Sequence, residues 1–257
     1  MTQAFNPGLA YGDRVGRYVA YRPTYPNEAV SHMLRHRQRA DPIDIADIGA
    51  GTGILSAQLL RYGHRVFAVE PEGQMRQAAQ ATLSGCPGFQ SVDGSAEATT
   101  LPDRSVDLVV AAQALHWFEP TAARREFARI LRPGGRAAAI WNERRRSGSV
   151  FRTAFEHFLS EMQQDIVGDR QSYAETVDDV AGRFFGVGSY AEAAFSHDDR
   201  LDRRQFAGRI LSGSFAPGAA HQRYAHWCAA IDDFFDAHAE SGYVTIEYET
   251  VVVSGTV

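Results

Sequence analysis

The chain has 257 residues, of which 44% are hydrophobic and 22% charged, and these values are ordinary for a soluble globular protein. This length allows one α/β domain with an appended subdomain. The net charge of −5 disfavours nucleic acid as a partner, because a phosphate backbone binds basic surfaces. No apolar stretch approaches the ~20 residues that span a membrane, and the first residues lack the features of a signal peptide. The two cysteines form no CxxC pair, which fits a cytoplasmic protein.

The N-terminal segment, residues 1–26, is rich in tyrosine and arginine. One interpretation is an arm whose aromatic rings pack on the rest of the protein. The other is a lid, in which Arg22 pairs with a carboxylate while the ring of Tyr18 or Tyr21 faces a positively charged ligand.

The next segment, residues 27–39, is predicted to be a helix, because Pro26 suits its first turn. His32 and His36 have a spacing that could in principle hold a metal ion. Several arginines surround them and no carboxylate of this helix completes a site. We therefore predict a solvated basic face and no metal.

Residues 45–60 contain an apolar run, a turn with three glycines and an amphipathic stretch, and residues 65–70 form a second apolar run that ends in an acid. This order predicts the first strand–helix–strand unit of a nucleotide-binding sheet. Gly49 and Gly51 allow a tight turn and a close approach to a ligand, and Gly53 allows close packing of helix and strand. The acid, Glu70, stands at a strand end about 20 residues after the first glycine, where a carboxylate accepts both hydroxyls of a ribose.

The spacing of this turn indicates which nucleotide it binds. Dinucleotide-binding turns read G-x-G-x-x-G and face a pyrophosphate, whereas this turn reads G-x-G-x-G and follows Asp47. A carboxylate there would repel a pyrophosphate but suits a ligand that carries an ammonium and a sulfonium. The pattern Asp-x-Gly-x-Gly-x-Gly resembles motif I of the class I methyltransferases that use S-adenosylmethionine (SAM). The resemblance implies SAM as cofactor and makes a nicotinamide oxidoreductase the weaker alternative.

After a predicted helix at 72–83 and a short third strand at 89–92, the chain turns through Gly94, Ser95, Ala96 and Glu97. In many class I methyltransferases this turn carries an aspartate that accepts the adenine amino group, and Ser95 stands in its place here. Serine still accepts a hydrogen bond, as a shorter neutral group, and the N–H of Ala96 could meet an adenine nitrogen. Glu97 is either the alternative acid or a charge at a helix start.

Residues 106–118 are predicted to form a buried fourth strand and its exit loop, with Asp107 in a structural position at the entry end. Open α/β sheets bind ligands at the carboxyl ends of their strands, so Gln113 and the residues up to Phe118 are expected at the site. His116 is either a general base or a residue that packs or positions the substrate. Methyl transfer is a one-step displacement that depends on alignment, and a carboxylate acceptor, already ionised at neutral pH, needs no base.

The second half of the chain continues the sheet and interrupts it with helices. The predicted elements are a helix at 120–131, a strand at 136–142, cap helices within 150–188, a strand at 190–196, helices at 202–211 and around 224–235, and a final strand at 243–253. The arginine run at 144–146 is either a solvated loop or a surface that attracts an acidic substrate.

These elements predict an α/β fold with a Rossmann-like, mostly parallel sheet of about seven strands, helices on both faces and a helical cap. The predicted parts are an N-terminal lid at 1–26, a SAM-binding core at 27–142, a cap insertion at 143–188, and a C-terminal part at 189–257 that completes the sheet.

Three further strings, YVAYRPTYP, AQALHWF and LRPGGRAAAIWN, resemble the trans-aconitate-methyltransferase-like branch of the class I enzymes. This resemblance implies an antiparallel last strand and SAM-dependent methyl transfer to a small molecule, with a carboxylate as candidate acceptor. The cofactor residues it implies are Tyr18, Tyr21, Arg22, Asp47, Gly49, Ala50, Gly51, Thr52, Gly53, Glu70, Pro71, Gly94, Ser95, Ala96, Gln113 and Ala114. The substrate residues are His116, Trp117, Trp141 and Arg144, and His116 is also the candidate catalytic residue.

Two other functions stay open on the sequence alone. One is O- or N-methylation of a hydrophobic aromatic metabolite with His116 as base. The other is a protein that binds SAM without transferring its methyl group, as a regulator or scaffold. The sequence carries no signal for the acceptor atom or for the oligomeric state.

Overall fold

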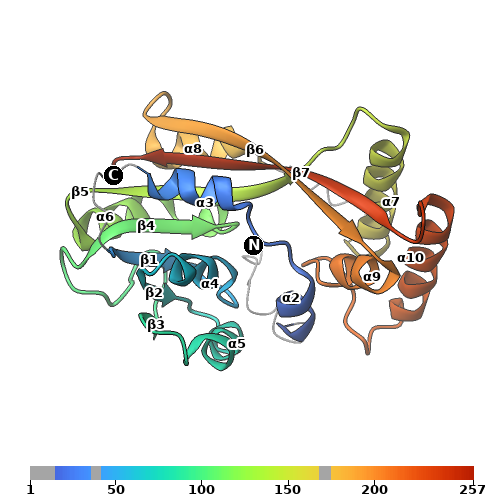
Figure 1. Cartoon of the computed structure of the whole chain (residues 1–257), viewed down its shortest axis with the longest axis horizontal. Helices are drawn as coiled ribbons and strands as arrows, with labels where there is room; N and C mark the ends of the chain where they lie inside the picture. The colour runs from blue at the N-terminus through green and yellow to red at the C-terminus, as the bar shows by residue number, and fades with distance from the viewer. Residues whose placement is uncertain (1–14, 36–41, 168–174) are drawn as a thin grey trace. The chain divides into compact units, whose positions relative to one another are not determined.

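The computed structural model describes residues 15–35, 42–167 and 175–257. Within them the chain forms a seven-stranded sheet in the order β3-β2-β1-β4-β5-β7-β6 (Figure 1). The strands are β1 Asp44–Ile48, β2 Arg65–Val69, β3 Phe89–Val92, β4 Val106–Ala112, β5 Leu131–Arg144, β6 Tyr190–Leu201 and β7 Val244–Gly255. Neighbours from β3 to β5 are parallel, and the last strands are antiparallel, as the arrow of β7 shows (Figure 1). The predicted fold class is confirmed.

The helices connect these strands in the order that the sequence predicts. They are α2 Val15–Tyr21, α3 Asn27–Leu34, α4 Ile54–Arg61, α5 Gly73–Leu83, the 3₁₀ helix η2 Leu115–Trp117, α6 Pro120–Ile130, α7 Val150–Val167, α8 Val177–Phe185, α9 Arg203–Leu211 and α10 Tyr224–His238. Side chains of α6 and α8 share a buried cluster with Ala46 of β1, whereas side chains of α3 and α4 share another with its neighbour Ile45. Because successive strand residues face opposite sides, helices cover both faces of the sheet here.

Contacts between residues divide the chain into two compact units, which we call the sheet unit and the second unit. The sheet unit comprises Thr24–Asn142, Ala174–Phe195 and Thr250–Val257. The second unit comprises Met1–Pro23, Glu143–Tyr173 and Ser196–Glu249, and its own buried cluster joins α7, α9 and α10. The helices of the predicted cap segment 143–188 belong to different units, α7 to the second unit and α8 to the sheet unit.

Several element boundaries differ from those predicted. The β5 strand begins at Leu131 rather than at 136, because Leu131 already pairs with Val106 before a shift in the strand register. The β6 strand continues to Leu201, well beyond residue 196, and its exposure alternates along its length. Helix α9 begins one residue later than predicted, since Asp202 is its N-cap and accepts a hydrogen bond from the Gln205 N–H.

The structural position predicted for Asp107 is confirmed. Its Oδ2 accepts hydrogen bonds from the Asp44 N–H at 3.0 Å and from Arg132 at 2.7 Å. These partners lie at the amino ends of β1 and β5, opposite the edge where a ligand is expected.

The two histidines of the basic helix do not come together as a described pair. The ring of His32 packs against Phe195 with ring centroids 5.4 Å apart, and His36 lies outside the described residues. Within the part of the chain that the structure describes, no group of three or more His, Cys, Asp or Glu side chains could hold a metal ion. None of the helices in that part is both long and apolar enough to cross a membrane.

Candidate cofactor site

The glycine turn joins the carboxyl end of β1 to α4 with three residues in the left-handed backbone region. Gly49, Gly51 and Gly53 have φ values of +66°, +57° and +82°. The N–H groups of Gly49 and Ala50 both donate to the carbonyl of Val69, at 2.9 and 3.1 Å, which ties the turn to the end of β2. A side chain at any of these glycines would strain the backbone, so glycine is required by conformation.

The three glycines differ in their surroundings: two are closely packed by other residues, and one borders open space. A Cβ at Gly49 would lie 2.9 Å from the Cβ of Ala114, and one at Gly53 would lie 2.7 Å from Cδ1 of Leu83. Gly53 therefore allows close packing of α4 against α5, and the predicted contact with a strand is corrected to a contact between helices. A Cβ at Gly51 would meet no atom within 4 Å, so this backbone borders open space that a ligand can approach.

Asp47 is a fully buried carboxylate on the strand below this turn. Its Oδ2 accepts a hydrogen bond from Ser56 at 2.7 Å, and its Oδ1 has no hydrogen-bond partner among the described residues. Burial, and secondarily the charge of Glu70, raises the pKa of Asp47 to about 6. The buried hydroxyl of Thr52 also lacks a partner within the described chain. Two unpaired polar atoms beside one turn are costly in a folded protein unless a ligand or water completes them.

Glu70 follows the last residue of β2 and is 8% exposed. One oxygen accepts the Gly51 N–H at 2.7 Å and the other accepts the Glu72 N–H at 2.9 Å. Burial raises the pKa of Glu70, and the two backbone hydrogen bonds oppose that rise. A carboxylate has about four acceptor positions, so two remain for ribose hydroxyls. The neighbouring Pro71 carbonyl accepts from Arg76 at 3.2 Å.

The turn predicted to bind adenine is stabilised by hydrogen bonds between its own residues. The Ser95 N–H donates to the Ala98 carbonyl at 3.1 Å, and its hydroxyl accepts the Glu97 N–H at 3.3 Å. Ala96 is buried, and a Cβ at Gly94 would lie 2.7 Å from the Thr99 carbonyl oxygen. Glu97 accepts the N–H of Glu119, the N-cap residue of α6, at 3.0 Å. This contact favours the helix-start role for Glu97 over the role of an adenine acceptor.

Several predicted residues come together where β4 ends, on the same edge as the glycine turn. Gln113 has a φ of +54°, which is strained for a side-chain-bearing residue, and its N–H donates to Ile140 at 2.9 Å. His116 and Trp117 are exposed neighbours whose ring centroids lie 4.7 Å apart. Desolvation by the surrounding protein lowers the pKa of His116, and the carboxylate of Glu175 opposes this effect.

Phe118, which the sequence places in the exit loop of the fourth strand, completes this edge. Its ring would lie 3.5 Å from a Cβ placed on Gly49, so it borders the glycine turn. The same ring packs edge-on against Phe127 of α6 with centroids 6.2 Å apart. Its position directly after His116 and Trp117 was the signal available in the sequence.

The three residues predicted for a lid are engaged within the second unit. Tyr21 packs so closely on α9 that a Cβ at Gly208 would lie 2.4 Å from its ring. The Arg22 guanidinium donates to the Ser212 carbonyl at 3.2 Å and lies 4.9 Å from the centre of the Tyr18 ring. Its Nε is buried without a hydrogen-bond partner among the described residues. The packing interpretation thus accounts for the tyrosines, and one donor of Arg22 is left for a ligand.

Two of the predicted substrate residues are already engaged by other parts of the protein, one by burial and one in an ion pair. Trp141 is 4% exposed inside the core of the sheet unit. Arg144 pairs with Glu156 at 2.9 Å, in the second unit. Its neighbours in the arginine run also face acids, Arg145 with Glu249 at 3.7 Å and Arg146 with Glu156 at 3.9 Å. These ion pairs weaken the hypothesis that the run attracts an acidic substrate.

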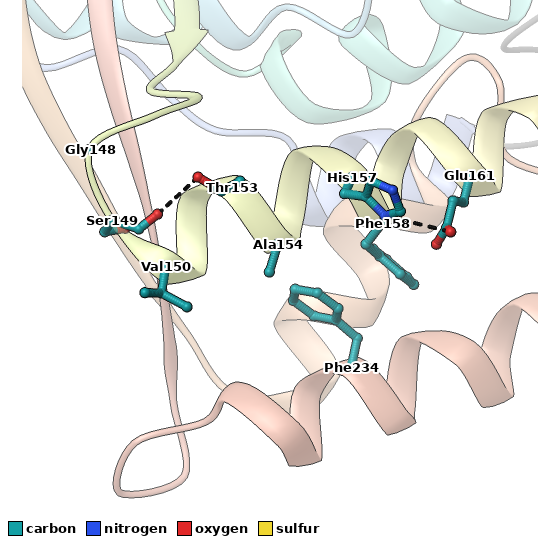
Figure 2. Close-up of a pocket in the computed structure, with 9 residues that line it drawn as sticks. All are labelled: Gly148, Ser149, Val150, Thr153, Ala154, His157, Phe158, Glu161 and Phe234. Atoms are coloured by element: carbon teal, nitrogen blue, oxygen red, sulfur yellow. Dashed lines mark hydrogen bonds and ion pairs between the residues drawn. The ribbon is translucent and has the colours of Figure 1, made fainter.

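The second unit has a hollow of about 870 Å³ on helices α7 and α10 (Figure 2). Phe158 and Phe234 stack on each other at its edge, with ring centroids 4.6 Å apart. Its polar side includes His157 and Glu161, whose side chains lie 3.5 Å apart. None of the residues predicted to bind the cofactor or the substrate lines this hollow.

A family model and several curated proteins match part of this chain. A family model described as a methyltransferase domain matches residues 46–139. An uncharacterised methyltransferase of Mycobacterium tuberculosis is 43% identical over 136 residues, which is 53% of this chain and 53% of that protein. The chain thus spans about half the length of the curated relatives it matches.

Solved structures resemble the chain over most of its length. A protein of Anaeromyxobacter dehalogenans has a TM-score of 0.67 at 22% identity, covering 92% of this chain and 98% of that one. A cyclase has a TM-score of 0.55 at 15% identity, covering 97% and 95%. At such identities the likeness shows the fold alone. Residues 46–139 thus match a methyltransferase-domain family, and the solved structures share the Rossmann-like fold of this chain.

Proposed function

We propose that the protein is a SAM-dependent methyltransferase that acts on a small molecule. The observation that carries this proposal is the buried Asp47, with one unpaired oxygen, beneath a glycine turn that is open at Gly51. A buried carboxylate of this kind suits a ligand with an ammonium and a sulfonium, as SAM has. The match to the methyltransferase-domain family and the similarity to proteins named methyltransferases support the same reaction.

Different residues at this edge would bind different parts of the cofactor. Asp47 and the glycine turn would hold its methionine end, Glu70 would accept the ribose hydroxyls, and Ala96 would frame the adenine with Ser95. SAM supplies a methyl group on a sulfonium leaving group, so the protein has to align the acceptor and exclude water rather than form an intermediate.

Calorimetry with SAM and with S-adenosylhomocysteine (SAH) tests this proposal directly. We expect dissociation constants in the micromolar range for both compounds and no binding of NADH. Absence of heat and of thermal stabilisation with both SAM and SAH would refute it. Binding without methyl transfer to any acceptor in a panel screened with labelled SAM would instead favour the non-catalytic SAM-binding protein. The cyclase neighbour makes that screen necessary, because one fold supports several reactions.

Replacing Glu70 by alanine should weaken SAM and SAH binding by about 1.5–3 kcal/mol, the scale of hydrogen bonds to a charged group. The variant also loses the acceptors of the Gly51 and Glu72 N–H groups, so a modest loss of thermal stability should accompany it. Glu72→Ala is the matched control, because Glu72 caps α5 by accepting the Met75 N–H at 2.7 Å. The control should lose stability while its dissociation constant stays unchanged. An unaltered dissociation constant in Glu70→Ala would mean that the ribose binds elsewhere.

For the acceptor, we favour a flat hydrophobic molecule over a carboxylate. The arginines expected to attract an anion are already paired with acids, whereas His116 and the 43% exposed Trp117 offer rings at the cofactor edge. Aromatic faces bind planar apolar groups, and a hydroxyl or amine on such a molecule must lose a proton to be methylated. His116 is the titratable group that we assign to this proton transfer.

The pH dependence of methyl transfer separates the two classes of acceptor. If His116 is the base, kcat/KM should rise with pH and level off before neutrality, because the lowered pKa leaves the imidazole neutral there. His116→Asn should then lose roughly 10²-fold or more. A carboxylate acceptor predicts the contrary result, a flat profile from about pH 6 to 9 and a variant that keeps most of its activity.

A further inference from the structure

Residues 24 and 25, which we call the strap, are held on both sides by buried side-chain amides of the sheet unit. Gln58 of α4 accepts the Tyr25 N–H at 3.1 Å and donates to the Tyr25 carbonyl at 2.7 Å. Asn142 in β5 donates to the Thr24 carbonyl at 3.1 Å. Gln58 is 5% exposed and its two hydrogen bonds are shielded from water, whereas the hydrogen bond of Asn142, which is 9% exposed, is partly shielded.

The two amides also connect the strap to both sides of the predicted cofactor edge. Gln58 lies on the helix that starts directly after Gly53 of the glycine turn. The backbone carbonyl of Asn142 accepts the Gln113 side-chain amide at 3.4 Å. A chain of polar contacts thus runs from Gln113 through Asn142 and the strap to Gln58. One end is Gln113, a predicted cofactor residue, and the other lies on the helix that follows the glycine turn.

Asn142 lies at a point where the chain passes from one unit to the other. Among the points at which the chain passes between its two units are those after Pro23, after Asn142 and after Glu249. Besides holding Thr24, Asn142 accepts the hydroxyl of the fully buried Thr250 at 2.7 Å. The side chain of Asn142 therefore holds the chain at all three of these points, with its amide N–H as donor to one partner and its amide oxygen as acceptor from the other.

We infer that Gln58 and Asn142 are positioning residues, through which ordering of the strap and binding of the cofactor favour each other. A ligand that fixes Gln113 and the glycine turn removes freedom from both ends of the polar chain, so the strap loses fewer conformations in becoming ordered. By reciprocity, loosening the strap lowers the affinity for the ligand. This inference rests on the proposed function.

Hydrogen exchange at the Tyr25 amide, with and without SAH, tests the inference in the full-length protein. This N–H is the donor to Gln58, so its exchange reports directly on the strap. We expect saturating SAH to slow its exchange by roughly tenfold or more. The inference is overturned if SAH binds and leaves this exchange unchanged.

Substitutions give the second measurement. Gln58→Met and Asn142→Leu keep side-chain size and remove the amides, and each should raise the SAH dissociation constant roughly tenfold. Gln77→Met, on an exposed position of α5, is the matched control and should change it less than about twofold. The double variant should lose less than the product of the single losses, because both act on one strap.

The outcomes distinguish this inference from the function on which it rests. Variants that melt earlier but bind SAH like the wild type would make both residues merely structural. If the variants do not fold, hydrogen exchange at the Tyr25 amide of the wild-type protein, with and without SAH, still tests the inference. If the wild type does not bind SAH at all, the proposed function and its coupling to the strap both fail. Faster exchange at the Tyr25 amide in the ligand-free variants would then show only that Gln58 and Asn142 hold the strap in place.

Discussion

Asp47→Asn should weaken SAM binding by roughly tenfold to a hundredfold without destabilising the ligand-free protein at neutral pH. Asparagine keeps the oxygen that accepts the Ser56 hydroxyl, and it removes a negative charge from a position that water does not reach. Binding therefore loses its charge partner for the cofactor, while folding is relieved of a buried charge. Calorimetry gives the first quantity and thermal or chemical denaturation the second.

The pH dependence of stability makes this prediction sharper. The pKa of Asp47 is about 6 in the folded protein and near 3.8 in the unfolded chain. Between these values the folded state holds a proton that the unfolded state has released, so the wild-type free energy of unfolding falls as pH rises from about 4 to 6. The fall stops above pH 6, where both states are ionised. A two-unit difference corresponds to at most about 3 kcal/mol.

The asparagine variant lacks this contribution, so its free energy of unfolding should decline less over the same pH range. Asp107→Asn is the control at the opposite end of the sheet, where the carboxylate is paired with Arg132. That variant should lose stability through the broken ion pair and retain its affinity for SAM. Equal affinities of wild type and Asp47→Asn for SAM would remove Asp47 from the cofactor site.

The fold was predictable because its signals are local. The alternation of apolar runs with amphipathic stretches gave the order of strands and helices, and the glycine turn marked the first strand–helix junction. The start of β5 was missed because Pro133, Gly134 and Gly135 are typical of a loop, although they lie within the strand. The division into two units was not predictable, since it follows from contacts between segments far apart in the chain.

In the candidate site, too, local spacing predicted some residues and could not predict others. Asp47, the glycines and Glu70 lie within one strand–helix–strand unit, so their spacing alone predicts their proximity. The partners of Arg22 and Arg144 are not encoded by spacing, and the structure pairs Arg22 with a carbonyl 190 residues away. The roles of Gln58 and Asn142 likewise depend on distant backbone groups, which no local pattern contains.

Gly49→Ala and Gly51→Ala should separate the structural from the ligand-binding part of the glycine turn. Both substitutions place a side chain on a left-handed backbone, at a cost of about 1–2 kcal/mol. In Gly49→Ala the new Cβ also lies 2.9 Å from that of Ala114, a methyl group that cannot rotate away. The backbone must shift, so we expect a total loss of about 2–4 kcal/mol. A fall in Tm of about 5–10 °C should accompany it, because a kilocalorie is worth about 2–4 °C in a chain of this size.

In Gly51→Ala the new Cβ meets no protein atom within 4 Å, so its cost in stability should be limited to the backbone strain. The same Cβ projects into the space that we assign to the cofactor, and it should weaken SAH binding by tenfold or more, a loss of about 1.4 kcal/mol. Measured side by side, Gly49→Ala should mainly lower the melting temperature, and Gly51→Ala should mainly raise the SAH dissociation constant measured by calorimetry. If Gly51→Ala melts slightly earlier and binds SAH as the wild type does, the cofactor does not approach this turn. The unpaired oxygen of Asp47 would then require another partner.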